Sequence, residues 1–389
     1  MKNIQRIEVA DALRGFAIMG ILLLHTIEHF NFYSFPEVSN SFLKFTDKAV
    51  WESLFFTFGG KAYGIFALLF GFSFFIQDRN QLDRGNDFRP RFLWRLFLLF
   101  IWGNINAMFF TGEILVLYSL LGIVLVFTAR IPTKAALIIA IVFMLQPLDL
   151  GKLIYALLNP EYVPGDSMAM SHFKEAYIVQ SKGTFFETVK MNLWHGQLAS
   201  LTWAWENGRI FQTSSFFILG MLIGRCKLFI YNEKNIKFWQ YVLVTGVICF
   251  FPLNGLANLL PDFIENPAIL TPLTLIIRSL ANFGFMAFLV GVFILAYYNT
   301  DKIHSILKKL IPYGQMSLTN YITQSIVGSM LFYNWGFALH NKLCITFSFF
   351  LAIVLFILQY MFCKWWMAHH KQGPLEYIWK KATWIGTKK

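Results

Sequence analysis

Apolar residues are concentrated in ten runs along this chain, and short polar or charged segments separate the runs. A helix that crosses a bilayer needs about 20 apolar residues, and each run is close to or above that length. The runs cover residues 14–33, 50–77, 92–110, 113–129, 134–150, 210–225, 238–259, 271–298, 313–335 and 343–364. The pattern predicts an all-α polytopic membrane protein with about ten transmembrane helices.

The longest segment outside the runs, residues 151–209, is predicted to lie on the outer side of the membrane. It is too short and too apolar for an independent enzyme domain, and it contains Trp194, Trp203 and Trp205. Tryptophan prefers the headgroup level, so part of this segment is expected to be an interfacial helix. The C-terminal sequence GPLEYIWKKATWIGTKK is expected to be an in-plane anchor on the inner side. Residues 1–389 are expected to form one integral membrane domain.

Composition excludes a soluble protein, because 57% of the residues are hydrophobic, 14% are charged and the mean hydropathy is +0.54. The formal net charge of +12 comes largely from Lys and Arg between the runs, which predicts cytoplasmic loops and termini rather than nucleic-acid binding. Residues 1–7 are basic and precede an apolar run without a small-residue cleavage site, so we expect an uncleaved signal anchor. The lipid bilayer is the partner that composition predicts.

The first run contains the most informative polar residues, Arg14 and His25. Eleven positions return a helix to within about 20° of its starting direction, so both side chains share one face, about 16 Å apart along the axis. Glu28 and His29 fall within roughly 40° of that face. Ionisable groups inside a membrane indicate a protein-lined site or a wet cavity, so this stripe is a candidate site. His25 and His29 could hold a metal, but no third ligand accompanies them and no metal is predicted.

Lys61 lies inside the second run, directly after Gly59 and Gly60. Paired glycines indicate either close helix packing or a helix break whose freed backbone groups line a cavity. The lysine favours the break, with its ammonium group in a substrate cavity. The alternative is a lysine side chain that extends to the outer headgroups.

Arg91 and Arg95 are one turn apart at the inner end of the third run. Such a pair can bind phosphate oxygens as a fork, and Arg14 is expected at the same depth. The three arginines are therefore predicted to form an anion pocket at the cytoplasmic mouth. The alternative is the ordinary positive charge at the cytoplasmic end of a transmembrane helix.

Further polar residues lie deeper in the runs or in the outer half, namely Asn104, Asn106, Glu113, Arg209 and Arg278. Buried amides need hydrogen-bond partners, and buried arginines need a counter-charge or a wet cavity. The carboxylates expected to supply the counter-charge are Glu28, Glu113 and Glu206. A structural ion-pair network and a substrate site both explain these residues.

In the ninth run, Ser317, Asn320, Tyr321 and Gln324 share one face. Thr319 and Thr323 point elsewhere and are expected to bond back to their own helix. Packing between helices and a substrate cavity both account for the shared face. No nucleophile elbow, Walker A, zincin or dinucleotide-binding motif occurs in a supporting context.

Five stretches of the chain resemble the DUF418 or YeiB-like family of bacterial inner-membrane proteins, with a DUF418-like part over about residues 210–385. They are ADALRGFAIMGILLLH, GKAYGIFALLFGFSF, RFLWRLFLLFIWGNINAMFFTGEILVLYSLLG, GQMSLTNYITQS and GPLEYIW. The resemblance implies a multi-pass protein of the bacterial inner membrane. This family is in turn similar to the transmembrane acyltransferase superfamily, which includes the acyltransferase-3 proteins and the lysosomal heparan glucosaminide acetyltransferase.

In acyltransferase-3 proteins, an Arg-x10-His arrangement on the first helix is tied to use of the acyl donor. Arg14 and His25 match that spacing. The chain departs from the common DUF418 pattern, which has Asn at the position of His25 and His at the position of Asn106. If these two positions face each other, either arrangement leaves one His and one Asn in the same site.

The resemblance and the polar residues together predict an acyltransferase. It would move an acyl group from a cytoplasmic acyl-CoA-type donor to a glycan or lipid-linked acceptor at the outer face. Binding of the donor phosphates is assigned to Arg14, Arg91 and Arg95. General-base or acyl-carrier chemistry, with orientation of the imidazole ring, is assigned to His25, Glu28 and Asn106. The substrate cavity is predicted to contain His29, Lys61, Asn104, Glu113, Arg278, Ser317, Asn320 and Gln324.

The alternative function is a transporter or flippase of an anionic small solute or a lipid-linked substrate. The sequence leaves the oligomeric state open. In a transporter, the same buried charges would bind the solute or relay protons between the two faces. A helix break at Gly59 and Gly60 suits that function equally well.

Overall fold

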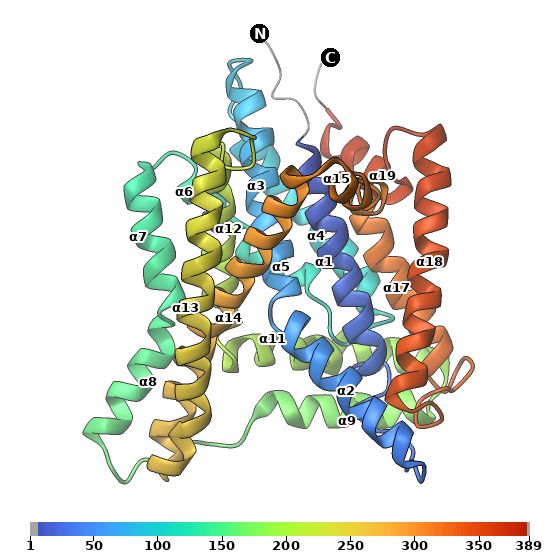
Figure 1. The fold of residues 1–389 in the computed structure, drawn as a ribbon. Coiled ribbons are helices and arrows are strands. Elements are labelled where there is room, and N and C mark those ends of the chain that lie inside the picture. The colour runs from blue at the N-terminus through green and yellow to red at the C-terminus, as the bar shows by residue number, and fades with distance from the viewer. Residues whose placement is uncertain (1–6, 387–389) are drawn as a thin grey trace.

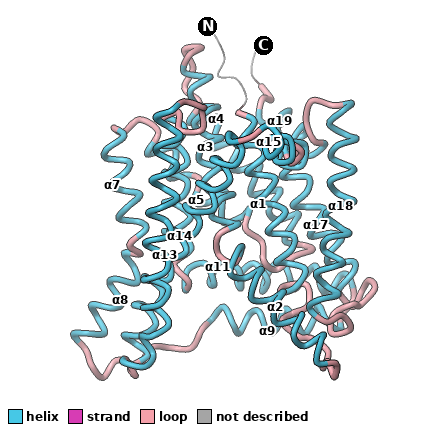
Figure 2. Tube along the Cα trace, in the orientation of Figure 1, coloured by secondary structure: helices cyan, strands magenta, loops and turns pink. Residues whose placement is uncertain are grey.

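A computed structural model describes residues 7–386 of the chain. Within these residues the regular elements are helices and no β-strand occurs (Figure 1, Figure 2). The long helices stand side by side as a bundle, and shorter helices gather at its two ends (Figure 1). The predicted all-α fold is confirmed.

Five helical segments are long and apolar enough to cross a membrane. They are α1 (Glu8–Ile27), the segment Ser41–Leu82 that contains α2 (Ser41–Phe58) and α3 (Ala62–Leu82), α13 (Glu233–Phe263), α14 (Pro267–Asn299) and α18 (Ile345–His369). A sixth span results if α7 (Thr133–Met144) and α8 (Pro147–Leu158), which are bent by 48°, are counted together. These helices are those of a membrane protein.

The other predicted runs also form helices, but these are shorter or more strongly charged. They are α4 (Arg89–Ala107), α5 (Leu115–Leu121), α6 (Ile123–Thr128), α12 (Arg209–Arg225), α16 (Ile311–Gln315) and α17 (Ser317–Phe332). Gly122 separates α5 from α6, and Met316 separates α16 from α17. The predicted number of transmembrane helices therefore exceeds the number that helix length and apolarity support.

Two predicted runs have different boundaries in the structure. The first helix ends at Ile27, and residues 28–33 form turns. The second run is interrupted at residues 59–61. There Gly60 has a φ of +71°, a conformation that glycine adopts at little cost and other residues rarely adopt. The glycine pair thus marks a helix break, which is one of the two structures predicted for it.

α1 lies inside the bundle, where it packs against α2, α3, α16, α17 and α18. Glycines allow its backbone to approach α16 closely. A Cβ atom on Gly15 would lie 2.5 Å from the carbonyl oxygen of Leu310, and one on Gly314 would overlap the carbonyl oxygen of Asp11. Larger side chains at either glycine would push the two helices apart, so this contact fixes the position of α1.

The shorter helices define two ends of the bundle. At the end where α1 begins lie α15 (Asp301–Lys308) and α19 (Pro374–Thr383), and we call it the α19 end (Figure 1). At the opposite end, which we call the α9 end, α9 and α11 run across the bundle (Figure 1). The elements there are α9 (Met168–Lys182), α10 (Phe185–Met191), the π-helix η1 (Asn192–Gly196) and α11 (Gln197–Glu206). The predicted segment 151–209 is thus helical, and its three tryptophans are exposed.

Candidate functional site

A cavity of about 620 Å³ lies at the α19 end, among α1, α3, α4, α17 and α19. Its ionisable lining consists of Arg14, Arg84, Arg95 and Lys380, with the carboxylates Asp11 and Glu376. Much of the remaining wall is aromatic and includes Phe66, Phe70, Tyr118 and Tyr321. Pockets of this size bind small molecules, and the excess of basic side chains favours an anionic ligand.

Arg14 is held at the cavity wall by two hydrogen bonds. Its Nη1 atom donates to Asp11 Oδ1 at 2.7 Å, and its Nη2 atom donates to Ser73 Oγ at 2.8 Å. Gln315 Nε2 donates to the second oxygen of Asp11 at 3.4 Å. A guanidinium group has five N–H donors, so these two bonds orient Arg14 without using its full capacity. Arg14 thus lies at the cavity wall, and its role in binding an anion stays a prediction.

Arg95 and Arg91 have different surroundings although they are one turn apart on α4. The Arg95 guanidinium lies 3.6 Å from the centre of the Trp379 ring, at the cavity wall. Arg91 is not a lining residue, and its Nη1 atom donates to the carbonyl oxygens of Thr383 and Ile385, both at 3.0 Å. The predicted pocket of three arginines is corrected to two, because carbonyl oxygens at the end of α19, which lack helical partners, bind Arg91.

Glu376 joins α19 to the start of α17. Its Oε1 atom accepts the backbone N–H groups of Leu318 at 2.7 Å and Thr319 at 3.0 Å, and its Oε2 atom accepts the Thr319 hydroxyl at 2.6 Å. The carboxylate therefore caps α17, whose first N–H groups lack partners within the helix. Burial raises the pKa of Glu376, and these hydrogen bonds oppose the shift. The predicted anchor helix is thus part of the cavity wall, and Thr319 bonds to Glu376 instead of its own helix.

His25 lies at the α9 end in a cluster of aromatic and ionisable side chains. Its ring centre is 4.7 Å from that of Phe110 and 5.5 Å from that of His29. His29 Nε2 lies 3.5 Å from Glu28 Oε1, and the Tyr33 hydroxyl donates to Glu28 Oε2 at 3.4 Å. Glu28 therefore pairs with His29 and Tyr33 and not, as predicted, with His25. The reason is that α1 has ended at this point, so its helical face does not continue.

Asn106, the other residue predicted to orient the His25 ring, is fully buried and donates to the Glu113 carboxylate. This carboxylate also accepts the backbone N–H of Leu115 at the start of α5. Glu113 is thus a helix cap and not the predicted counter-charge of an arginine. Asn106 reaches the His25 cluster through Phe110, whose backbone N–H donates to the Asn106 carbonyl oxygen at 3.2 Å.

Two buried tyrosines form part of the cavity wall. Tyr118 and Tyr321 both line the cavity, and Tyr118 donates its hydroxyl to the carbonyl oxygen of Tyr63 at 2.8 Å. His25 is not a lining residue of the cavity. The predicted donor-binding residues Arg14 and Arg95 therefore line the cavity, whereas the predicted catalytic residue His25 does not.

Lys61 is buried at the break between α2 and α3. Its Nζ atom donates to the Phe55 carbonyl oxygen at 3.3 Å and lies 5.4 Å from the centre of the Phe285 ring. Arg209 approaches the same break, since a Cβ atom on Gly60 would lie 3.4 Å from Arg209 Nη2. Within residues 7–386, neither cation has a carboxylate at ion-pair distance. The carboxylates predicted as counter-charges therefore do not pair with Lys61 or Arg209. The two cations lie together at the break between α2 and α3.

Two other predicted cavity residues connect helices. Asn104 Oδ1 accepts a hydrogen bond from Gln197 Nε2 at 2.9 Å, which links α4 to α11. Arg278 Nη2 donates to Asn258 Oδ1 at 3.4 Å, which links α14 to α13. Neither residue lines the cavity at the α19 end. Both contacts are structural, and the structure does not bring these residues to the His25 cluster.

The polar face predicted for the ninth run is divided between two roles. Ser317 lines the cavity. Asn320 Nδ2 donates to the Tyr313 carbonyl oxygen, and Gln324 Nε2 donates to the Tyr313 hydroxyl, both at 2.9 Å. These two residues therefore serve helix packing, which was one of the predicted alternatives. Thr323 donates to a carbonyl oxygen of its own helix at 2.8 Å, as predicted.

Sequence reasoning missed several residues of the cavity wall, although a signal for most of them exists. Ser73, Gln77, Gln81 and Arg84 follow one another at spacings of three or four along and just after α3, and all four line the cavity. This spacing places polar side chains on one helix face. Lys380 has no comparable signal, because only the folded position of α19 brings it to the cavity.

Comparison with known proteins identifies a family whose function is not established. Residues 223–386 match the family described as "Protein of unknown function (DUF418)", which confirms the predicted DUF418 resemblance. The chain is 27% identical to "Uncharacterized protein YxaH" of Bacillus subtilis (strain 168), over 98% of this chain and 95% of that protein. It is 24% identical to "Uncharacterized 39.9 kDa protein in amylase 3'region" of Bacillus acidopullulyticus, over 98% and 94% of the two chains.

A shorter match involves a third bacterial protein. Over 70 residues, or 18% of each chain, the sequence is 31% identical to "Uncharacterized protein YeiB" of Escherichia coli (strain K12). No solved structure matches the chain. The similarity to acyltransferases, which the family resemblance implies and the Arg14 and His25 spacing matches, stays a prediction.

Proposed function

We propose that this membrane protein, whose residues 223–386 match the DUF418 family, is an acyltransferase of the bacterial inner membrane. The donor is an acyl-CoA-type thioester that binds at the α19 end. The acceptor is a glycan or a lipid-linked molecule that is reached from the α9 end. The observation that supports this function is the cavity at the α19 end, which combines four basic side chains with aromatic walls.

The cavity has the two properties that such a donor requires. Arg14 and Arg95 present guanidinium groups, which bind phosphate oxygens through paired hydrogen bonds. Arg84 and Lys380 add positive charge at the same wall. The aromatic side chains deeper in the cavity suit the less polar arm of the donor, which carries the acyl group.

The reaction itself is assigned to His25. Arg14 and His25 are about 16 Å apart along α1, a distance that an extended pantetheine arm can span. The arm passes Tyr118 and Tyr321, so the reaction requires these side chains to move apart. His25 then takes the proton of an acceptor hydroxyl or amine as that group attacks the thioester carbonyl. The C–S bond breaks, and the leaving thiolate takes up the proton from the imidazolium.

The experiment that tests this function is thermal unfolding of the detergent-purified full chain with acetyl-CoA and with coenzyme A. At a concentration of 100 times Kd, a ligand stabilises the folded state by about 2.7 kcal/mol. We expect this shift for the wild type and for His25→Ala. We expect Arg14→Ala and Arg95→Ala to lose most of it.

Arg91→Ala is the matched control for Arg95→Ala. Arg91 lies on α4 like Arg95, but it does not line the cavity. It is expected to keep the ligand-induced shift. No shift of the wild type at millimolar acetyl-CoA, or equal shifts for Arg14→Ala and Arg91→Ala, would contradict a donor site in this cavity.

A transporter of an anionic solute is the second candidate, and Lys61 and Arg209 favour it. Both cations lie at the α2–α3 break, and within the described chain neither is neutralised by a carboxylate at ion-pair distance. An anion could bind between these two cations, at the break between α2 and α3. Solute flux into proteoliposomes that Lys61→Met abolishes, together with no response to acetyl-CoA, would favour transport over acyl transfer.

A further inference from the structure

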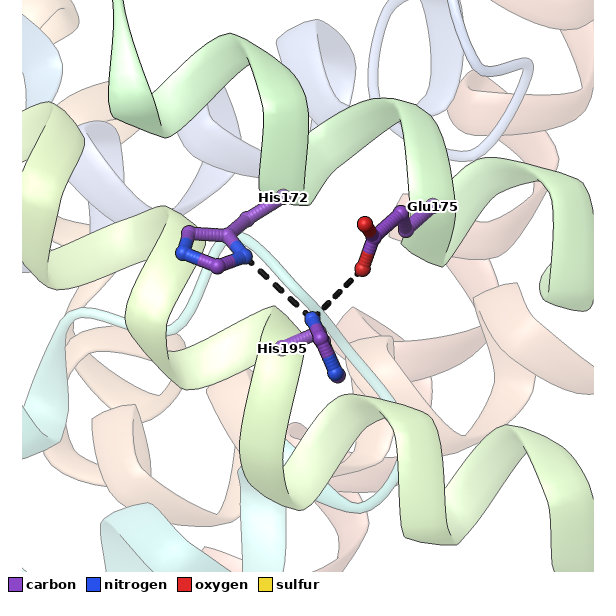
Figure 3. A group of neighbouring side chains, drawn as sticks. All are labelled: His172, Glu175 and His195. Atoms are coloured by element: carbon purple, nitrogen blue, oxygen red, sulfur yellow. Dashed lines mark hydrogen bonds and ion pairs between the residues drawn. The ribbon is translucent and has the colours of Figure 1, made fainter.

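Three potential metal ligands, His172, Glu175 and His195, lie together at the α9 end (Figure 3). The Nδ1 atoms of the two histidines are 3.2 Å apart, and His195 Nδ1 lies 2.6 Å from Glu175 Oε2. One potential ligand atom from each residue lies within 4.8 Å of the others. We propose that this group binds a divalent transition metal ion of the zinc class through two imidazole nitrogens and one carboxylate oxygen.

The arrangement of hydrogen-bonding groups supports a cation at this position. A neutral imidazole has a single N–H group. If His195 Nδ1 carries it, that one proton faces two acceptors, the His172 nitrogen and the Glu175 carboxylate (Figure 3). If His172 Nδ1 carries it, His195 Nδ1 faces the carboxylate with a lone pair. A divalent cation removes this conflict because it accepts a lone pair from each of the three atoms.

The separation of the two histidine nitrogens fits the coordination geometry of zinc. With bonds of about 2.0–2.1 Å, a tetrahedral Zn²⁺ ion separates its ligand atoms by about 3.3 Å. The two histidine nitrogens are 3.2 Å apart and already have this separation. The Glu175 side chain is 50% exposed and can shift outward to reach it. Ca²⁺ and Mg²⁺ prefer purely oxygen ligands, so two imidazoles favour zinc or its neighbours.

The backbone around the three residues is fixed by other contacts. At the start of α9, Glu206 accepts the Ser167 hydroxyl at 2.6 Å, so Glu206 is a cap and not the predicted partner of an arginine. Near the end of α9, Gln180 Nε2 donates to Asn192 Oδ1 in η1 at 2.7 Å. His195 follows in the same π-helical segment, a type of element that is frequent at functional sites. Both supporting elements are thus held together without an ion.

The group is accessible from solution. His195 has a side chain that is 34% exposed, and it also lines a groove of about 580 Å³ with Lys182, Lys190 and Trp194. Three protein ligands leave a fourth position of a tetrahedral ion to water or to another ligand. The proposed site can therefore exchange its metal and does not depend on the acyltransferase function.

A metal ion at this position would hold α9 over the His25 cluster. Phe173 directly follows His172 in the chain, and its ring centre is 6.4 Å from that of His29. Tyr177, one turn further along α9, lies 6.5 Å from Tyr33 between ring centres. One face of α9 thus covers the cluster while His172 and Glu175 bind the ion. The metal would connect this cover to η1.

The test is a zinc titration of the full chain, purified without a polyhistidine tag and stripped with a chelator. Isothermal titration calorimetry is expected to give one Zn²⁺ per chain. Co²⁺ is expected to show the intense visible absorption of a tetrahedral site. His172→Ala, His195→Ala and Glu175→Gln should each lower the affinity by about tenfold or more.

His369→Ala is the matched control, because His369 is an exposed histidine on α18. This variant should bind zinc like the wild type. Glu175→Gln keeps the size of the side chain, so it decides the result if a histidine variant fails to fold. The proposal is overturned if the folded wild type binds no stoichiometric zinc, or if Glu175→Gln and the wild type bind zinc with equal affinity.

Discussion

The two ends of α1 place their polar side chains in different surroundings. At the α19 end, Arg14 lies at the wall of a cavity and is oriented by Asp11 and Ser73. At the α9 end, His25 packs against the rings of Phe110 and His29 and lines no part of that cavity. The first arrangement suits binding of an anion, and the second packs the imidazole of His25 among aromatic and ionisable side chains. The comparison suggests that binding and chemistry are separated along one helix.

The strongest way to test this separation is to remove the imidazole at the α9 end. His25→Ala is expected to lower the rate of acyl transfer by roughly 10² to 10⁴, the usual contribution of general acid–base catalysis. Binding of acetyl-CoA at the α19 end should not change. The measurement is transfer of labelled acetyl groups from acetyl-CoA to the lipid and glycan fractions of membrane vesicles that contain the protein.

His369→Ala serves as the control for this experiment, since His369 is exposed and remote in sequence from α1. Its transfer rate should equal that of the wild type. A His25→Ala variant with an unchanged transfer rate would remove the distinction between a binding end and a reactive end. A variant that loses acetyl-CoA binding together with transfer would show that the two ends act as one site.

A second test concerns the stability of the α9 end. Asn106→Ala leaves the buried Glu113 carboxylate with one donor fewer, so it is expected to lower the free energy of unfolding by about 1–3 kcal/mol. Asn104→Ala, two positions earlier, removes a half-exposed hydrogen bond to Gln197 and should cost less than about 1 kcal/mol. Thermal unfolding in detergent measures both. Equal losses in the free energy of unfolding would show that the hydrogen bond from Asn106 does not stabilise the Glu113 cap of α5.

Local periodicity was enough to predict much of this molecule. Each apolar run contains at least one helix, and the spacing of Arg14 and His25 puts them on one helix near its opposite ends. The glycine pair before Lys61 marks a helix break. These features depend on residues within about three helical turns of each other, and such relations can be read from the chain directly.

The errors concern contacts between residues that are distant in the chain. Arg91 binds carbonyl oxygens of residues 383 and 385, and nothing in its local sequence indicates the position of α19. The residues of the proposed metal site have no joint local signature for a similar reason. His172 and Glu175 are close in sequence, but His195 joins them only through the folding of η1 against α9. Sequence patterns of this length do not specify tertiary contacts of that kind.

The smallest expected effect is the pH dependence of the α19 end. Burial raises the pKa of Glu376 in the folded protein, so the folded state binds more protons than the unfolded state just above the ordinary glutamate pKa of about 4.3. Stability is therefore expected to fall as pH rises from that value through the raised pKa. Glu376→Gln keeps one acceptor oxygen for the amides of α17 and removes the titration. Its melting temperature should not show this pH-dependent fall.

Melting temperatures of the wild type and Glu376→Gln across this pH range provide the measurement, with the exposed Glu265→Gln as control. The wild type should lose stability relative to Glu376→Gln as pH rises, whereas Glu265→Gln should follow the wild type. The opposite slope would mean that the α17 amides stabilise the carboxylate more than burial disfavours it. The α19 end would then be held by a charged cap, and acidification would release α19 from α17.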